Sequence, residues 1–97
     1  MSQQKLPKYF YSSKNLRLFY IASEPSGLRL SVSKKFFRLA VDRNKIKRQI
    51  KEIFRTNDLY FKKGCFVVMV YKPFCELSYR EASFEIIKAV KSSLFKQ

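Results

Sequence analysis

The sequence predicts an α+β fold, a two-layer α/β sandwich in which helices lie on one side of a small mixed sheet. Two observations lead to this prediction: some segments have the composition and two-residue period of strands, and others repeat apolar residues at helical spacing. The chain has 97 residues, so its apolar segments must share one hydrophobic core. We therefore expect residues 1–97 to form a single domain with the order strand, strand, helix, strand, helix.

The amino-terminal third predicts two strands joined by a turn. Residues 1–8 are polar and are expected to be disordered, while residues 9–14 (YFYSSK) fit either the end of a short helix or an extended lead-in. Residues 16–22 (LRLFYIA) are rich in β-favouring side chains, and residues 28–33 (LRLSVS) alternate apolar and polar positions. Residues 23–27 (SEPSG) combine turn-forming residues. We expect the two strands to pair as a hairpin.

The middle of the chain predicts a helix followed by a buried strand. Between residues 39 and 55 one apolar stripe recurs at helical spacing. The stripe consists of Ile46, Ile50, Ile53 and Phe54. Residues 56–64 interrupt this pattern, and residues 65–71 (CFVVMVY) form a nearly continuous apolar run. Such a run is typical of a central strand that is covered on both faces.

A second helix is predicted after Ser78. Ser78 and Glu81 have the spacing of a capping box, in which each residue satisfies a backbone N–H of the other. The apolar side of this helix should carry Tyr79, Ala82, Ile86, Ile87, Val90 and Leu94. Glu81 and Glu85 lie one turn apart and could form a metal-binding pair, but capping and solvation account for them more simply.

The charge of the chain predicts a polyanionic partner. Twenty-one Lys and Arg residues against seven Asp and Glu residues give a formal net charge of +14. Nucleic acid and an anionic membrane surface both fit this charge. No segment reaches the length of a membrane-spanning helix, and the amino-terminal residues contain no apolar signal-peptide core. We therefore expect a cytoplasmic protein.

The cysteines predict neither zinc binding nor catalysis. Cys65 and Cys75 are ten residues apart, and the sequence contains no histidine. Zinc sites need clustered Cys and His ligands, so no zinc is expected. We expect both cysteines to be reduced thiols without a catalytic role, because a free cysteine usually behaves as a small apolar residue.

The first predicted helix carries an unusual concentration of positive charge. Nine basic and two acidic residues between positions 34 and 55 give a net charge of +7. The outer side of the helix should carry Asn44, Lys47, Arg48, Lys51 and Arg55. Lys51 lies one turn from both Lys47 and Arg55, whereas only Arg48 has an acidic neighbour at this spacing, Glu52. This imbalance favours a phosphate-binding face over an ordinary solvated face, and a membrane-surface helix fits poorly because the apolar stripe is needed for the core.

The segment from Ser31 to Arg55 resembles the motif of bacterial ribonuclease P protein subunits. That family has an RNxxKRxxRExFR core at the start of its second helix, preceded by a strand that ends in a VSKK-like run. The matching residues here are Arg43, Asn44, Lys47, Arg48, Glu52, Phe54 and Arg55, with Lys51 and Lys45 where the family usually has arginines. An apolar strand ending in Lys72-Pro73 and the later Ser78 helix start also fit, so the resemblance covers about residues 9–96.

The resemblance implies a function and a distinctive fold. Ribonuclease P removes the 5′ leader from precursor tRNA; its RNA subunit is the catalyst and uses Mg²⁺, and the small protein supports that RNA and binds the leader. We therefore expect a subunit of an endoribonuclease that has no catalytic residues or metal site of its own. Its partners would be the ribonuclease P RNA and the precursor tRNA leader. The family fold also contains a left-handed βαβ crossover.

Carried over by position, the resemblance assigns two groups of residues. The RNA-binding group consists of Lys34, Lys35, Arg38, Arg43, Asn44, Lys45, Lys47, Arg48, Lys51 and Arg55. The leader-binding cleft would contain Phe10 and Tyr20, because aromatic rings stack on bases without demanding a sequence. Ordinary core packing of Phe10 and Tyr20 remains the alternative.

Two other functions share part of this pattern. An autonomous nuclease needs a general base or a two-metal cluster, and the chain has no histidine and seven scattered carboxylates. A ribosomal or other general RNA-binding protein would share the charge and the fold class. It would not explain the spacing of the motif, so the ribonuclease P subunit is the favoured interpretation.

Overall fold

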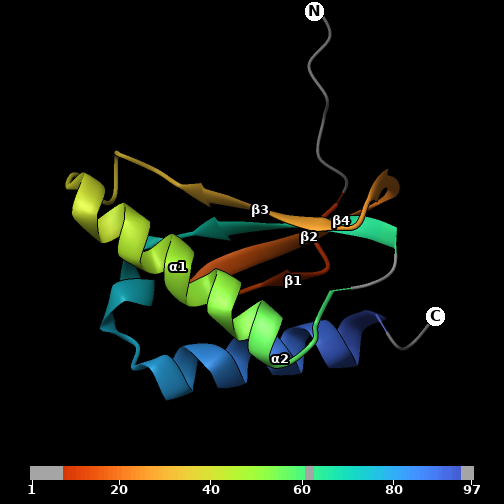
Figure 1. The fold of residues 1–97 in the computed structure, drawn as a ribbon. Helices are drawn as coiled ribbons and strands as arrows, with labels where there is room; N and C mark the ends of the chain where they lie inside the picture. Colours follow the sequence, from red (N-terminus) through yellow and green to blue (C-terminus); the bar gives the residue numbers. More distant parts are fainter. Residues whose placement is uncertain (1–7, 61–62, 95–97) are drawn as a thin grey trace, which may run out of the picture.

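In residues 8–60 and 63–94, which the computed structural model describes, four strands form one mixed sheet (Figure 1). The strands are β1 (Tyr11–Ser12), β2 (Leu16–Pro25), β3 (Gly27–Val32) and β4 (Lys63–Val70). Their order across the sheet is β1-β2-β4-β3, with β3 parallel to β4 and the other pairs antiparallel. The predicted mixed sheet is confirmed, and residues 9–14 contain a short strand. The predicted disorder of residues 1–8 lies, except for Lys8, outside the described residues.

The predicted hairpin of β2 and β3 is wrong, because β4 lies between these two strands. Leu18 of β2 and Leu30 of β3 both pair with Val68 of β4, from opposite sides. Strand β2 also runs on to Pro25, so the chain reverses only at Ser26, close to the start of β4. The most apolar segment of the chain takes the central position, where strands on both sides pair its backbone and flank its side chains.

The sheet has a covered face and an open face. The helical segments are α1 (Ala40–Thr56), the short 3₁₀ helix η1 (Lys72–Glu76) and α2 (Tyr79–Leu94). Both α-helices lie on the covered face, as predicted, and no helix in the described part of the chain lies on the other (Figure 1). The predicted central position of β4 is therefore confirmed, although no helix in the described part of the chain covers its open face (Figure 1). Val67 on the open face is still buried, because its partners Phe19 and Arg29 flank it from the neighbouring strands.

Helix α1 has the predicted apolar stripe and a clear end. Its buried residues are Ile46, Ile50, Ile53 and Phe54. After the helix, the side-chain amide of Asn57 donates to the Ile53 carbonyl at 2.9 Å, and Asp58 has a φ of +52°. A residue in this left-handed region does not continue a right-handed helix. The connection from β3 through α1 to the parallel strand β4 is the βαβ unit for which the resemblance implies a left-handed crossover.

Helix α2 starts at the predicted capping box. The Ser78 hydroxyl accepts a hydrogen bond from the Glu81 N–H at 3.1 Å, and the Glu81 carboxylate accepts one from the Ser78 N–H at 2.9 Å. Ala82 and Ile86 are buried as expected. Tyr79 was expected on the same apolar side but is 46% exposed. It is the first residue of the helix and extends beyond the edge of the core.

Glu85 binds three residues of the amino-terminal segment, whereas the sequence had suggested that it is solvated. Its carboxylate accepts hydrogen bonds from the hydroxyls of Tyr11 and Ser13, both at 2.6 Å, and from the Asn15 amide at 3.0 Å. Burial alone would raise the pKa of Glu85, but these hydrogen bonds outweigh it and lower that pKa. The three donors are at least 70 residues away in the sequence, so no local pattern could reveal this contact.

Candidate nucleic-acid interface

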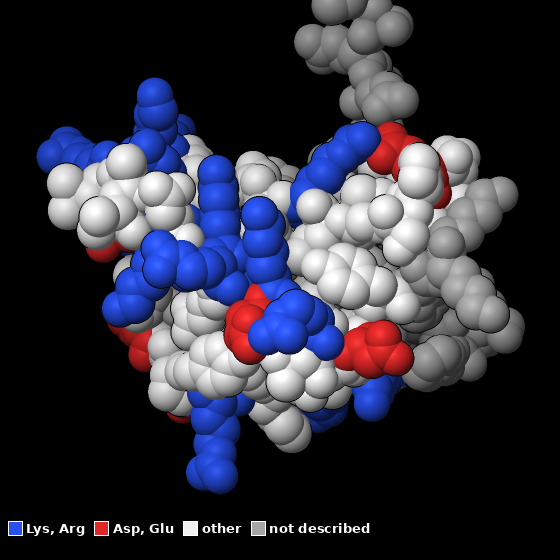
Figure 2. All heavy atoms as spheres, viewed as in Figure 1, with Lys and Arg blue, Asp and Glu red and all other residues white. Residues whose placement is uncertain are grey.

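The basic residues of α1 spread over three sides of the helix around its buried stripe. Arg43 and Lys47 are half-buried along one flank, and Lys45 is exposed on the other flank, where it lines a cavity beside α2. The exposed outer side between them carries Asn44, Arg48, Lys51 and Arg55. Figure 2 shows Lys and Arg side chains gathered over this part of the molecule. The predicted RNA-binding residues of the helix therefore form a wide basic surface rather than one narrow row.

Most of the positive charge on α1 has no ion-pair partner in residues 8–60 and 63–94. The sequence predicted an attraction between Arg48 and Glu52, but the Glu52 carboxylate instead binds Arg55 at 2.6 Å and Thr56 at 3.1 Å. The hydrogen bond from Arg55 is the main cause that lowers the pKa of Glu52. Among the described residues no other ion pair involves α1. Lys47, Arg48 and Lys51 are therefore available to an external anion.

Arg43 connects α1 to the basic loop before it. One of its guanidinium nitrogens donates to the carbonyls of Phe37 and Arg38, both at 2.9 Å. This contact fixes the end of a loop in which the Phe37 N–H binds the Ser33 carbonyl at 2.9 Å. Arg43 therefore has a structural contact in addition to its predicted role in binding RNA.

The loop residues predicted to bind RNA all lie at the surface. Lys34, Lys35 and Arg38 are exposed, and the Lys35 N–H donates to the Ser33 hydroxyl at 3.0 Å. Because Arg43 holds the end of this loop against the start of α1, the three cations extend the basic surface of the helix. The structure thus brings all ten predicted RNA-binding residues onto the loop and α1.

The two predicted leader-binding aromatics lie on the covered face of the sheet. The rings of Phe10 and Tyr20 both pack against the buried ring of Phe66, with centroid distances of 6.2 and 5.1 Å. The Tyr20 ring also lies so close to Gly64 that a Cβ at that position would overlap it. Gly64 has a φ of +100°, which favours glycine for a second reason. These contacts favour the alternative interpretation, in which both aromatics belong to the edge of the core.

A different aromatic surface, which the sequence analysis missed, lies on the open face. The Arg17 guanidinium lies 4.5 Å from the centre of the Tyr9 ring and 5.9 Å from that of Tyr71. Tyr9 packs edge-to-face on Phe19 at 6.2 Å, and Phe36 packs in the same way on Tyr71 at 6.1 Å. The signal was the two-residue period of β2, which places Arg17 and Phe19 on the face opposite to Leu16, Leu18 and Tyr20.

The described residues offer no evident metal or redox centre. No group of three or more His, Cys, Asp or Glu residues among them could hold a metal ion. Cys65 and Cys75 are both free; burial raises the pKa of the Cys65 thiol, while Cys75 is exposed and its sulfur lies 3.1 Å from the Lys72 carbonyl. No helix in the described part of the chain is long and apolar enough to cross a membrane.

This small α+β domain has a helix whose cations mostly lack ion pairs among the described residues, and an open sheet face that carries aromatic side chains. These are features of the class of RNA-binding proteins. A family model described as Ribonuclease P matches residues 6–94. The chain therefore belongs to the ribonuclease P protein family, and it is a component of the endoribonuclease that matures the 5′ end of tRNA.

Two curated relatives show the extent of the similarity. The ribonuclease P protein component of Rickettsia prowazekii (strain Madrid E) is 32% identical over 96 residues, which are 95% of this chain and 72% of the relative. The same component from Finegoldia magna is 30% identical over 90 residues, covering 92% of this chain and 79% of the relative.

Solved structures share the fold. The RNase P protein from Thermotoga maritima in complex with 1-(4-fluorophenyl)-2-thiourea has a TM-score of 0.71 and 24% identity over 88% of this chain and 84% of that chain. The Staphylococcus aureus RNase P protein has a TM-score of 0.66 with 24% identity over 86% of this chain and 80% of that chain. The predicted α+β fold class is confirmed.

Proposed function

We propose that this protein assists a catalytic RNA, the ribonuclease P RNA, in removing the 5′ leader of precursor tRNA. The observation that carries the proposal is the uncompensated positive charge of α1. Glu52 binds Arg55, and Lys47, Arg48 and Lys51 have no ion pair in the part of the chain that the structure describes. When such cations bind RNA phosphates, they release the condensed counterions of the RNA, and this release favours binding. Because precursor tRNA is the proposed substrate, we expect the protein to act in the cytoplasm.

The state of the acidic side chains supports catalysis by the RNA rather than by this chain. Four of the seven carboxylates already take part in internal contacts. These are Glu24, Glu52, Glu81 and Glu85. Hydrolysis would then depend on Mg²⁺ bound by the RNA, and the cations of α1 would lower the repulsion between RNA segments that must come together around those ions.

The ten predicted residues of the loop and α1 are our candidates for contacts with the RNA subunit. If they neutralise five phosphates, the logarithm of the binding constant should fall with the logarithm of the salt concentration with a slope between about −3.5 and −4.5. The measurement is filter binding to the ribonuclease P RNA between about 50 and 400 mM salt, with the Mg²⁺ concentration held constant. A slope close to zero would refute the charge argument.

A competitor tests whether the binding is specific. An unrelated structured RNA of equal length should displace the ribonuclease P RNA only weakly, because the proposed partner is one RNA fold. Equal displacement would instead indicate a general RNA-binding protein.

For the leader we propose the open sheet face around Arg17, Tyr9 and Tyr71. A guanidinium between two rings offers both a charge for phosphates and flat surfaces for bases. Arg17→Ala and Tyr9→Ala should weaken the binding of precursor tRNA to the reconstituted complex and leave the binding of mature tRNA, which lacks the leader, unchanged.

A matched variant on the covered face separates the two candidate leader sites. Tyr20→Leu removes the ring that could stack on a base and keeps an apolar side chain against Phe66, so it should affect neither tRNA. If Tyr20→Leu selectively weakens precursor binding and Arg17→Ala does not, the leader site is on the covered face.

A further inference from the structure

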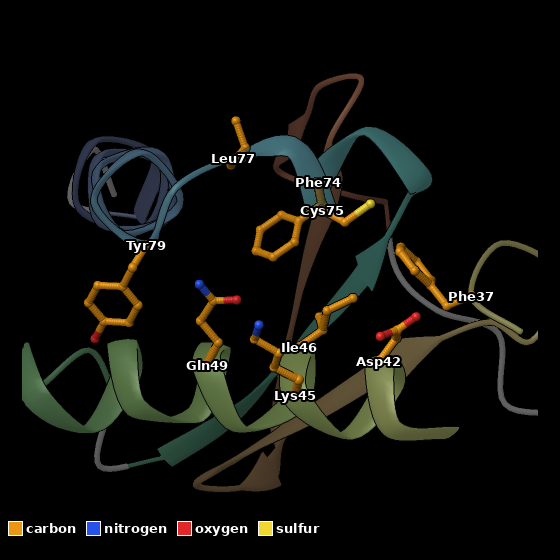
Figure 3. A pocket seen from close by; sticks show the side chains of 9 residues that line it. All are labelled: Phe37, Asp42, Lys45, Ile46, Gln49, Phe74, Cys75, Leu77 and Tyr79. Atoms are coloured by element: carbon orange, nitrogen blue, oxygen red, sulfur yellow. The ribbon is translucent and has the colours of Figure 1, made fainter. Parts of the chain in front are cut away.

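A cavity between α1 and the η1–α2 segment adjoins the basic surface described so far. It has a volume of about 430 Å³, within the range of roughly 300–1,000 Å³ of small-ligand sites. Figure 3 shows Phe74 of η1 at its centre, Lys45 and Gln49 rising from α1, and Tyr79 reaching from the start of α2 toward α1. A second hollow, which Lys45, Gln49 and Tyr79 also line, extends past Arg48. We call these two hollows together the interhelix groove.

The walls of the interhelix groove combine apolar and polar surface. Phe74 and Ile46 provide a floor of buried apolar side chains, with exposures of 2% and 6%. Tyr79 presents a ring that is 46% exposed at the rim. Gln49 is half-buried, and no side-chain hydrogen bond to it is found in the described residues. A polar amide over an apolar floor next to an open ring is a surface suited to a flat ligand with hydrogen-bonding edges.

The charges around the interhelix groove favour a ligand with a phosphate. Lys45 and Arg48 are both exposed and lack an ion pair in the described part of the chain. Two acidic residues also line the groove. Glu52 already binds Arg55 at 2.6 Å. Asp42 lies beside Phe37, at the end of the groove away from Tyr79 (Figure 3). The groove is continuous with the basic outer side of α1 through Arg48. A negatively charged polymer that binds the outer side of α1 would therefore lie next to the opening of the interhelix groove.

We propose that the interhelix groove binds one unpaired nucleotide of the ribonuclease P RNA. The base stacks on Tyr79 above the Phe74 floor, Gln49 forms hydrogen bonds with its edge, and Lys45 and Arg48 bind the flanking phosphates. This inference rests on the proposed function, since it places a segment of the same RNA partner. The rest of the basic surface would bind the phosphate backbone of the RNA. The groove would in addition recognise one unstacked base.

The test compares neutral groove variants with a charge variant on the outer side of α1. Tyr79→Ala should weaken binding of the ribonuclease P RNA by about tenfold, as expected for the loss of one stacked base. Gln49→Ala should weaken it by about threefold, because an uncharged hydrogen bond is lost. Neither variant should change the salt slope, whereas Lys51→Ala should reduce its magnitude by about 0.7 to 0.9.

Chemical probing of the RNA gives a second readout. With the wild-type protein, one unpaired base should be protected from base-specific methylating and carbodiimide reagents. The same base should become reactive with Tyr79→Ala and with Gln49→Ala. Tyr79→Phe keeps the ring and should restore both the affinity and the protection.

Phe84→Ala is the matched control, because Phe84 is a 66% exposed aromatic of α2 that does not line the groove. It should bind and protect the RNA as the wild type does, and thermal melting should show that all variants are folded. Wild-type affinity and protection in both groove variants would overturn this inference alone. A wild-type protein that fails to bind the ribonuclease P RNA would overturn the proposed function as well.

Discussion

The two helices pack on the same face of the sheet, but they differ in whether their charged side chains have partners inside the chain. On α2, Glu81 completes the capping box and Glu85 binds three donors from the amino-terminal segment. On α1, Lys47 and Lys51 have no ion pair within the described residues. A polar group that has a partner inside the chain stabilises the fold, whereas unpaired like charges destabilise it slightly and indicate an external partner. Substitutions of these polar side chains should therefore separate stability from RNA binding.

The largest effect should come from the inner side of α1. Phe54 is fully buried and packs against the ring of Phe66 at 5.4 Å. Phe54→Ala should lower the free energy of unfolding by about 3–5 kcal/mol, because it removes apolar contacts and leaves a cavity. Denaturant unfolding followed by circular dichroism measures this change. Phe84→Ala, at an exposed position, should change stability by less than about 0.5 kcal/mol, and equal losses in the two variants would contradict the assignment of the core.

A smaller effect is expected from Glu85, the carboxylate of α2 that binds the amino-terminal segment. Glu85→Ala leaves the buried Asn15 amide and two hydroxyls without their acceptor, which should cost about 1–3 kcal/mol. Urea unfolding at pH 7 provides the measurement. A variant as stable as the wild type would show that the contact adds nothing to folding.

The same carboxylate should make stability depend on pH. The pKa of Glu85 is lowered in the folded protein from its ordinary value of 4.5. Its contribution is therefore complete above the unfolded-state pKa and is lost as the pH falls through the lowered folded-state pKa. Melting temperatures between neutral and acidic pH should fall less steeply in Glu85→Gln, which cannot ionise. Parallel curves for the two proteins would show that Glu85 does not supply this dependence.

The capping box of α2 should contribute less than the Glu85 contact. Ser78→Ala removes the acceptor of the Glu81 N–H and should lower the free energy of unfolding by about 1 kcal/mol. Ser78→Asp keeps an acceptor at the same position and should recover most of the loss. If both variants lose the same stability, the hydroxyl contact is not the cause.

The smallest change in stability is expected on the outer side of α1. Lys51→Ala should shift the free energy of unfolding by less than about 0.5 kcal/mol, because the side chain is exposed and its removal relieves repulsion. The same variant should still bind the ribonuclease P RNA more weakly and with a shallower salt dependence. A large loss of stability with unchanged binding would reverse the contrast between the two helices.

The sequence by itself determined the two α-helices, the three longer strands and the charge of the surface. The apolar stripe of α1, the capping box at Ser78 and the apolar strand after Gly64 were all predicted from residues close together in the chain. These features follow from the 3.6- and two-residue periods, which depend only on local backbone geometry. The motif from Arg43 to Arg55 likewise needed only local spacing, and it led to the correct family.

Only the tertiary structure decided which elements are neighbours. A hairpin was the simplest arrangement of two consecutive strands, but β4 takes the position between them because burial of its side chains depends on the whole sheet. The same kind of distant contact turned Glu85 toward Tyr11, placed Tyr20 on the covered face and left Tyr79 at the rim of a cavity. Local periodicity shows on which side of a helix or strand a residue lies, but the packing of distant segments decides what that side contacts.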